Sequence, residues 1–246
     1  MEKEHLLLLG ATGLTGLAFI DLYLSHTTST RPYLTLYVRS IDKLPSSIST
    51  PPAAKVRIVT GSLELASQFA CATECAAEGF PPVTTVIISI GSYLSVSPIV
   101  TRFLWTQPTP LTEAFSSTIV PQLKRAGVKR IMTLSTPAST TVEYERKNMS
   151  LKWRLAGWMP YLFAPQGHEE MKGLARVTMT ESDGLEWTVF RVPHLTLGPD
   201  TGVVAGLLDE KYGGSFDLSR AGLARWIWDE IKGRKWVGQM VMLGNA

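Results

Sequence analysis

The N-terminal segment restricts the fold most, because an apolar run, a glycine turn and a helical pattern follow one another directly. Residues 5–9 (HLLLL) are typical of a parallel strand that is buried on both faces. The next residues read GATGLTG, and 14–24 carry apolar side chains at helical spacing. Gly10 permits a tight turn, Gly13 lets a pyrophosphate approach the backbone, and Gly16 lets the helix pack closely. This context predicts dinucleotide binding, and the alternative is a glycine turn that serves packing alone.

The rest of the chain alternates between strand-like and helix-like patterns. The predicted strands are 33–38, 56–59, 83–90, 129–134 and 187–192, and the predicted helices are 66–78, 110–126, 167–183 and 219–232. Such alternation is typical of βαβ units around a parallel sheet. We therefore expect an α/β fold: a Rossmann-like, doubly wound parallel sheet in a single NAD(P)-binding domain over residues 1–246, with aromatic-rich loop insertions on the substrate side.

Composition excludes several classes of protein. Of 246 residues, 45% are hydrophobic and 18% are charged, which excludes a disordered chain. The net charge of +3 is spread along the chain, so we expect no nucleic-acid partner. No apolar run is long enough for a membrane span or a signal peptide, so we expect a cytoplasmic protein without a membrane partner. Cys71 and Cys75 are expected to be reduced thiols, and no ligand cluster indicates a metal site.

The end of the second predicted strand indicates the cofactor. Tyr37 and Val38 are followed by Arg39, and the first carboxylate after it is Asp42. NAD sites usually place Asp or Glu here to bind the ribose 2′-hydroxyl, whereas an arginine suits a 2′-phosphate. The sequence therefore favours NADP(H) over NAD(H). The alternative is that Arg39 is a solvated surface arginine.

Two aromatic-rich stretches with prolines, 91–110 and 148–167, interrupt the alternation. Both follow predicted strands, at the side where open α/β sheets bind their ligands. One interpretation is a lid over a small apolar or aromatic substrate. The other is packing or a contact between two copies, which leaves a monomer or a homodimer open.

Most of the chain resembles the atypical short-chain dehydrogenases/reductases, in the NmrA-like, NAD(P)H-binding group. The resemblance is carried by LLGATGLTG (8–16), LYVRSIDKL (36–44), VTGSLEL (59–65), LKRAGVKRIMTLST (123–136), the stretch 168–202 and DLSRAGLARWIWDEI (217–231). The stretch 168–202 is most similar to the flavin reductase/biliverdin reductase B branch, which has a similar histidine before its helix and a Pro-Pro-His turn after the sixth strand, here Val192-Pro193-His194.

The resemblance implies a set of cofactor contacts. The residues expected at the phosphates are Gly10, Thr12, Gly13, Leu14, Thr15 and Arg39. Ser62 and Leu63 are expected near the adenine, and Ile90 and Gly91 near the ribose. Pro193 and His194 are expected near the nicotinamide. Ser62 departs from the family pattern, because relatives commonly have Asp there. This change is expected to weaken adenine recognition.

Several residues are candidates for the chemistry. Standard members of the superfamily pair a serine with Tyr-x-x-x-Lys, and the nearest match, Tyr144 and Lys147, is one residue short. We favour surface positions for both over a working pair. Ser135, directly after the fifth predicted strand, is expected either to bind a substrate carbonyl or to cap its turn.

His168, His194 and Tyr93 are the other candidates. The resemblance directs both histidines toward the nicotinamide, where a histidine is suited to acid–base work, and the alternative for each is a structural contact. Tyr93 follows the fourth predicted strand and is a further hydrogen-bond donor.

Three functions remain open. The first is an NADP(H)-dependent oxidoreductase that moves hydride to or from a small apolar or aromatic carbonyl, enone or quinone, in secondary metabolism. The second is an isomerase, cyclase or dehydratase on the same fold, because the Tyr-x-x-x-Lys pair is missing. The third is a non-catalytic NmrA-like dinucleotide sensor. Fold alone does not choose among them.

Overall fold

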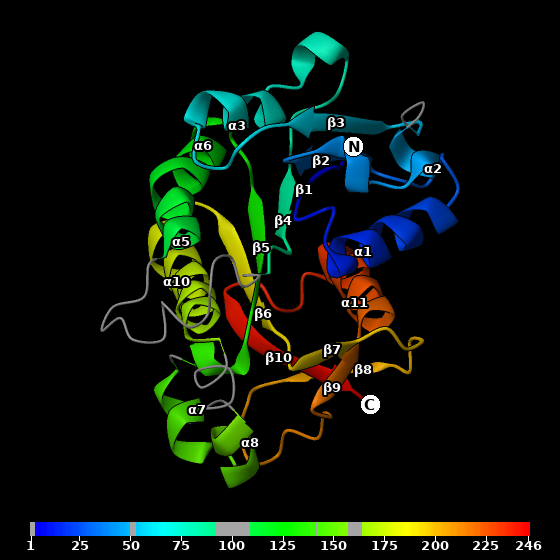
Figure 1. The fold of residues 1–246 in the computed structure, drawn as a ribbon. Helices are drawn as coiled ribbons and strands as arrows, with labels where there is room; N and C mark the ends of the chain where they lie inside the picture. The colour runs from blue at the N-terminus through cyan, green and yellow to red at the C-terminus, as the bar shows by residue number, and fades with distance from the viewer. Residues whose placement is uncertain (1–2, 50–52, 92–108, 141, 157–163) are drawn as a thin grey trace.

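A computed structural model describes residues 3–49, 53–91, 109–140, 142–156 and 164–246, and one large sheet organises them (Figure 1). Its eight strands run in the order β3-β2-β1-β4-β5-β6-β10-β8. They are β1 His5–Leu9, β2 Tyr33–Val38, β3 Val56–Thr60, β4 Thr85–Ile88, β5 Arg130–Ser135, β6 Glu186–Arg191, β8 Val203–Gly206 and β10 Gln239–Asn245. A second sheet pairs β7 (His194–Thr196) with β9 (Asp217–Ser219). The Rossmann-like α/β fold expected from the sequence is confirmed.

The sheet is parallel except at one edge. β8 runs antiparallel to β10, so the expectation of a wholly parallel sheet needs that correction. An antiparallel edge strand is common in sheets of this kind. β1 is an inner strand of the sheet, third in the order from β3, and every residue from His5 to Leu9 is buried. β1 lies between β2 and β4, which places the turn after β1 beside the ends of both neighbours.

Helices cover both faces of the sheet (Figure 1). Figure 1 shows α5 (Pro110–Ala114), α6 (Val120–Arg125) and α10 (Pro165–Glu181) on one side, and α1 (Leu14–Ser25) with α11 (Arg220–Gly233) on the other. Further α-helices within the described residues are α2 (Ser46–Ser49), α3 (Ala66–Thr73), α7 (Glu143–Asn148) and α8 (Leu151–Ala156). The predicted double winding is thus present, with Phe19 and Tyr23 of α1 packed against Trp228 of α11.

Two predicted helices differ in detail. The helix expected over 110–126 contains a π-helical turn at Phe115–Ile119. Pro121 follows that turn, and because proline has no N–H and its ring crowds the preceding turn, the wider turn accommodates it. The helix expected over 66–78 ends at Thr73, and a separate 3-10 turn forms at Ala76–Glu78.

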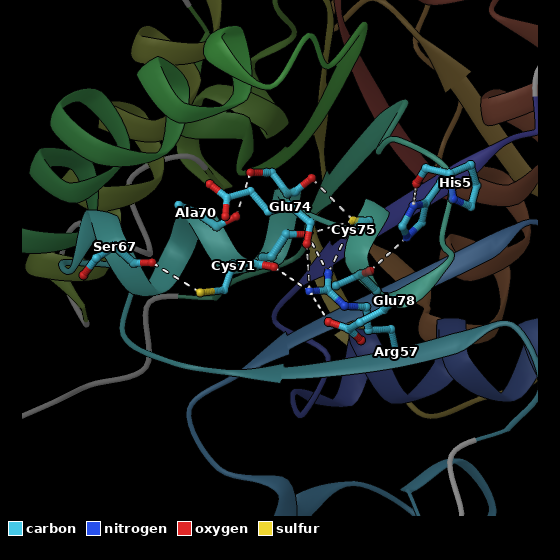
Figure 2. Close-up of polar contacts among 12 residues, drawn as sticks. His5, Arg57, Ser67, Ala70, Cys71, Glu74, Cys75 and Glu78 are labelled. Carbon is cyan, nitrogen blue, oxygen red and sulfur yellow. Dashed lines mark hydrogen bonds and ion pairs between the residues drawn. The ribbon is translucent and has the colours of Figure 1, made fainter.

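Arg57, near the start of β3, explains why α3 ends early (Figure 2). Its guanidinium donates to the carbonyl of Cys71 at 2.7 Å and to that of Glu74 at 3.2 Å. It also lies 3.3 Å from the Cys75 sulfur and forms an ion pair with Glu78 at 2.8 Å. Arg57 therefore satisfies helix-end carbonyls that α3 leaves open. Cys71 and Cys75 are both free thiols.

The predicted loop insertions fall partly outside the described residues. Residues 92–108 and 157–163 are not described, so the aromatic-rich stretches cannot be placed as wholes. Within the second stretch, residues 151–156 form α8, and Trp153 packs edge-on against Tyr212 and within 4.3 Å of the Phe216 ring. Among the described helices, none has the length and apolar character needed to span a bilayer.

Candidate functional site

The fold itself requires two of the three glycines after β1. Gly10 has a φ of +90°, and a Cβ there would lie 2.8 Å from the Ser89 backbone at the end of β4. A Cβ on Gly16 would lie 2.3 Å from the Gly10 carbonyl oxygen. Both contacts are with backbone, which cannot swing aside, so a side chain at either position is excluded.

Packing does not explain Gly13. Its φ of −78° and ψ of 157° are accessible to any residue, and a Cβ would meet only the Gly10 oxygen at 3.4 Å. The position therefore faces open space, and the missing side chain leaves the backbone accessible to a ligand. A glycine turn kept for packing alone accounts for Gly10 and Gly16 but leaves Gly13 unexplained.

The start of α1 is left without a protein cap. Gly13 is the N-cap residue and offers no side-chain hydrogen bond, and the first turn contains no acidic residue. The first amide N–H groups and the positive end of the helix dipole are therefore available to an anion. Of the other predicted phosphate contacts, Leu14 is exposed, Thr12 is half-buried and Thr15 is buried. This turn can hold a pyrophosphate.

Arg39 lies at the same edge of the sheet, one residue beyond β2. Within the described part of the chain its guanidinium makes no hydrogen bond or ion pair, and its side chain is exposed. It borders an open depression of about 440 Å³, which is lined by Arg39, Thr60, Gly61, Ser62 and Gln68. The nearby Asp42 carboxylate accepts a hydrogen bond from the Ser40 hydroxyl at 2.6 Å.

The hydrogen bonds that fix the shape of this depression were not predicted from the sequence. The Tyr37 hydroxyl donates to the Ser62 carbonyl at 2.8 Å, and burial raises the pKa of Tyr37 to about 12. A Cβ on Gly61 would lie 2.4 Å from that hydroxyl, so Tyr37 requires a glycine there. The Gln68 side chain accepts from the Ser62 amide N–H at 2.8 Å. The one signal for this contact in the sequence was Tyr37 itself, an aromatic residue with a polar hydroxyl near the end of an apolar strand.

The predicted ribose and adenine contacts lie at this edge too. Ile90 is half-buried and Gly91 exposed just after β4, and Leu63 is half-buried in the loop after β3. The Ser89 hydroxyl donates to the Leu9 carbonyl at 3.1 Å, which ties the ends of β1 and β4 together. The predicted cofactor residues from β1 to β4 therefore share the carboxyl edge of the sheet, where parallel sheets bind nucleotides.

At the end of β5, Ser135 is fully buried. Its hydroxyl donates to the Met171 carbonyl of α10 at 2.8 Å and lies 2.5 Å from the Ser139 hydroxyl. His168, on the first turns of α10, keeps 10% of its side chain exposed, and its Nε2 lies 3.7 Å from a Glu169 oxygen. Burial, followed by the charge of Lys172, lowers the pKa of His168, so its imidazole is neutral at neutral pH.

His194 begins β7 directly after the half-buried Pro193. Its Nδ1 lies 2.8 Å from an Asp217 carboxylate oxygen, and 76% of its side chain is exposed. Its amide N–H donates to the Phe216 carbonyl at 3.1 Å, which places it beside the Trp153–Phe216 ring pair. The carboxylate fixes the imidazole orientation and leaves Nε2 toward solvent, an arrangement suited to proton transfer.

The remaining candidates do not join this group. Tyr93 lies outside the described residues. Tyr144 is 53% exposed, and its hydroxyl is 3.5 Å from Asp209. The Lys147 side chain is 72% exposed and forms an ion pair with Glu143 at 2.7 Å. Both are surface residues, as favoured from the sequence. No group of three or more potential metal ligands occurs among the described residues.

A buried ion pair that the sequence did not reveal connects this edge to α7. Arg191, the last residue of β6, donates to both Glu145 carboxylate oxygens at 2.7 and 2.6 Å, and both side chains are fully buried. Glu145 also accepts from the Leu208 amide at 2.6 Å, and Arg191 donates to Thr140 at 2.9 Å. The pair fixes α7 beside the strand end that leads to Pro193.

Residues 10–233 match the model of the NAD(P)H-binding family. The chain belongs to this family. The predicted NAD(P)H-binding family and the predicted class of cofactor, a nicotinamide dinucleotide, are thereby confirmed. Among curated protein sequences, none matches this family member.

Solved structures share the fold of this family member at low sequence identity. A short-chain dehydrogenase/reductase from Veillonella parvula in complex with NADP has a TM-score of 0.67 and 18% identity, covering 98% of this chain and 94% of that chain. The anaerobilin reductase ChuY from Escherichia coli O157:H7 has a TM-score of 0.67 and 18% identity, covering 98% and 97%. A Rossmann-fold NAD(P)-binding family protein from Shigella flexneri has a TM-score of 0.63 and 17% identity, covering 99% and 94%.

Proposed function

We propose that the protein is an NADP(H)-dependent oxidoreductase that transfers hydride to or from a small apolar or aromatic carbonyl, enone or quinone-type substrate. The observation that carries this proposal is Gly13. Neither backbone strain nor packing requires a glycine there, yet it opens the uncapped start of α1 at the carboxyl end of β1. The family model, which covers residues 10–233, supports the same assignment.

The choice of NADP(H) rests on Arg39. Its exposed guanidinium has no partner within the described residues and borders the depression next to β3. Its planar donors suit a 2′-phosphate. Gly10, Thr12, Gly13, Leu14 and Thr15 would hold the pyrophosphate. Ser62, Leu63, Ile90 and Gly91 would border the adenosine, and Pro193 the nicotinamide end.

Bound NADPH would supply a hydride to a substrate carbon, and the chain must then deliver a proton to the substrate oxygen. We assign this proton to His194, whose Nδ1 is held by Asp217 at 2.8 Å. Nε2 would donate the proton to the substrate oxygen, and the Asp217 carboxylate would hold the ring in the orientation that this transfer needs. His168 is the second candidate, as a neutral imidazole donating a hydrogen bond.

Ser135 has a different position in this scheme. Its one hydroxyl hydrogen is directed at the Met171 carbonyl, 2.8 Å away. This hydrogen bond holds α10 against β5. Ser135 would donate to a substrate only after its hydrogen bond to the Met171 carbonyl had broken. The preference for an apolar or aromatic substrate is supported by the exposed Phe216 ring next to His194.

Turnover of simple acceptors tests the proposal. The protein should oxidise NADPH in the presence of a quinone or an aromatic aldehyde. His194→Gln should lower kcat by about 100-fold, because general acid catalysis typically contributes this much. The Kd for NADPH should stay unchanged in this variant. His26→Gln, at the far end of α1, is the matched control and should keep wild-type kcat. NADPH binding without turnover of any acceptor would contradict the redox assignment and favour a sensor.

A second candidate is an isomerase, cyclase or dehydratase on the same fold. It is supported by the separate surface positions of Tyr144 and Lys147, which leave no Tyr-Lys pair in the described residues. This function requires turnover of a substrate by protein stripped of dinucleotide. Loss of all turnover on stripping, with recovery on adding NADPH, would exclude it.

A further inference from the structure

Three consecutive residues at the end of β3 form much of the wall of the depression beside Arg39. The residues that line this depression are Arg39, Thr60, Gly61, Ser62 and Gln68. Thr60 is the last residue of β3, so Gly61 and Ser62 lie beyond the strand, where its regular ladder has ended. The position of this wall therefore depends on individual hydrogen bonds.

Hydrogen bonds to β2 and α3 hold Gly61 and Ser62. The Gly61 N–H donates to the Val38 carbonyl at 3.0 Å, and the Ser62 N–H donates to Oε1 of Gln68 at 2.8 Å. The Ser62 carbonyl accepts from the Tyr37 hydroxyl at 2.8 Å. Tyr37 is thus the side chain of β2 that fixes this wall.

Tyr37 is itself held firmly. Its side chain is 4% exposed, and its ring packs edge-on against the Phe69 ring of α3 at a centroid distance of 5.4 Å. Burial raises the pKa of Tyr37 to about 12, so its hydroxyl keeps the hydrogen that it donates at neutral pH. Tyr37 is outside the lining of the depression, so it acts on a ligand only through the residues that it holds.

Gly61 is a glycine because of the Tyr37 hydroxyl. Its φ is not positive, so backbone strain does not require a glycine at this position. A Cβ on Gly61 would lie 2.4 Å from the hydroxyl oxygen, and 3.0 Å from both the Tyr37 ring carbon that bears it and the Gln68 Cβ. Small shifts of side chains relieve the two longer contacts, but the contact with the oxygen displaces the hydroxyl. The missing side chain therefore lets the hydroxyl reach the Ser62 carbonyl.

We infer that Tyr37 is a positioning residue for the dinucleotide, because its hydroxyl holds the Gly61–Ser62 backbone in the shape that receives the adenosine end. The inference rests on the proposed function, which places the adenosine at this depression. Without the hydroxyl the loop adopts further conformations, and binding must then order it at a cost in affinity. Tyr37 holds neither Arg39 nor the nicotinamide end. It therefore acts on the affinity for NADPH and NADH alike and leaves kcat unchanged.

Calorimetric titration of wild type and Tyr37→Phe tests the inference. The variant should raise the Kd for NADPH and the Kd for NADH by the same factor, about threefold or more. Its kcat with a quinone acceptor at saturating NADPH should stay within twofold of wild type. A Kd for NADPH within twofold of wild type would overturn the inference and leave the proposed function standing. Failure of wild type to bind NADPH at all would overturn the proposed function, and the inference with it.

Tyr23→Phe is the matched control for a general loss of stability. The buried Tyr23 hydroxyl also donates to a backbone carbonyl, that of Pro32 at 3.0 Å, and burial raises the pKa of Tyr23 to about 12. Tyr23 lies on α1, away from the depression. Both variants should lower Tm by about 2–4 °C, but Tyr23→Phe should leave both Kd values unchanged. An equal rise in Kd in the two variants would assign the effect to stability and overturn the inference.

A double variant tests the role of the hydroxyl itself. Gly61→Ala displaces the hydroxyl and should raise the Kd for NADPH by about tenfold or more. Tyr37→Phe/Gly61→Ala lacks the oxygen that the new methyl group would meet, so it should bind NADPH at least about threefold more tightly than Gly61→Ala alone. Losses of affinity that simply add in the double variant would contradict a role for the hydroxyl.

Discussion

Two arginines at opposite ends of the same strand pair differ in what surrounds them. Arg57, near the start of β3, is buried and makes hydrogen bonds to helix-end carbonyls, a contact to a sulfur and an ion pair (Figure 2). Arg39, just after β2, is exposed and has no partner among the described residues. Both belong to neighbouring parallel strands, so the contrast is between the amino and the carboxyl edge of one sheet.

The two edges use polar groups in different ways. At the amino edge the fold satisfies its own donors: the His5 ring lies 2.6 Å from the Pro81 carbonyl and 2.8 Å from the Thr35 hydroxyl. At the carboxyl edge the start of α1, Arg39 and the Gln68 amide retain donors that have no acceptor among the described residues. Exposed donors are hydrated in the free protein, so those at the carboxyl edge can exchange water for a ligand without breaking a contact of the fold. Substitutions at the two edges should therefore act on different quantities.

The largest expected effect on stability is that of Arg57→Met. It removes the donors of the Cys71 and Glu74 carbonyls and the partner of Glu78. We expect a loss of about 2–4 kcal/mol in the free energy of unfolding, somewhat below the cost of breaking a fully buried pair, because Glu78 is half exposed. Urea denaturation measures it. In the folded fraction, the Kd for NADPH should stay within twofold of wild type.

The matched substitution at the other edge is Arg39→Met. It should change the free energy of unfolding by less than about 0.5 kcal/mol, as is usual for an exposed side chain. If Arg39→Met and Arg57→Met destabilised the protein equally, the distinction between the two edges would be wrong.

A second pair of variants divides the glycine turn itself. Gly16→Ala places a methyl group 2.3 Å from the Gly10 oxygen and should cost about 1–3 kcal/mol of stability. Gly13→Ala meets only an ordinary contact and should cost less than about 0.5 kcal/mol, since the loss at the N-cap is offset by the stiffer unfolded chain. Gly13→Ala should instead weaken NADPH binding by about tenfold or more. Wild-type affinity in Gly13→Ala would contradict the assignment of this position to the pyrophosphate.

The smallest effect concerns acid stability at the amino edge. Burial lowers the pKa of His5, so below about pH 6.5 the unfolded chain binds a proton that the folded protein does not. The contribution of neutral His5 to the free energy of unfolding should therefore be fully present above about pH 6.5 and decrease as the pH falls toward the lowered pKa. Between pH 7.5 and 5.5, Tm should fall by about 1–3 °C more in wild type than in His5→Asn. Burial lowers the pKa of His168 as well, so His168→Asn is the control that separates the two. Equal slopes in wild type and His5→Asn would contradict the role of His5.

The sequence predicted the six parallel strands β1–β6 because each is an apolar run with turn residues around it. It did not predict β8 or β10. β8 has only four residues and ends in Gly206, and β10 depends on pairing with β6 and β8, which lie far away in the chain. Strand formation follows such neighbours more than local preference. The π-turn before Pro121 was not predicted, because one extra residue in a single turn hardly changes the spacing of apolar residues along a helix.

The candidate site divides in the same way. The glycine turn and Arg39 are local patterns, so the sequence reveals them. The Tyr37–Ser62 hydrogen bond joins residues 25 apart, and the Arg191–Glu145 pair joins residues 46 apart. Neither pair has a spacing that signals contact, because the partners come together only when the whole chain has folded. The sequence therefore predicts the local motifs of the site but not the distant residues that hold the site in place.

The most direct test of the central claim, that the carboxyl edge binds NADP(H) through Arg39, is an equilibrium titration of wild type and Arg39→Met with NADPH and NADH. We predict that wild type binds NADPH at least about tenfold more tightly than NADH, because a guanidinium–phosphate contact contributes this much. Arg39→Met should lose that preference while its affinity for NADH stays the same. Equal affinities for NADPH and NADH in wild type, or an unchanged preference in Arg39→Met, would contradict the account.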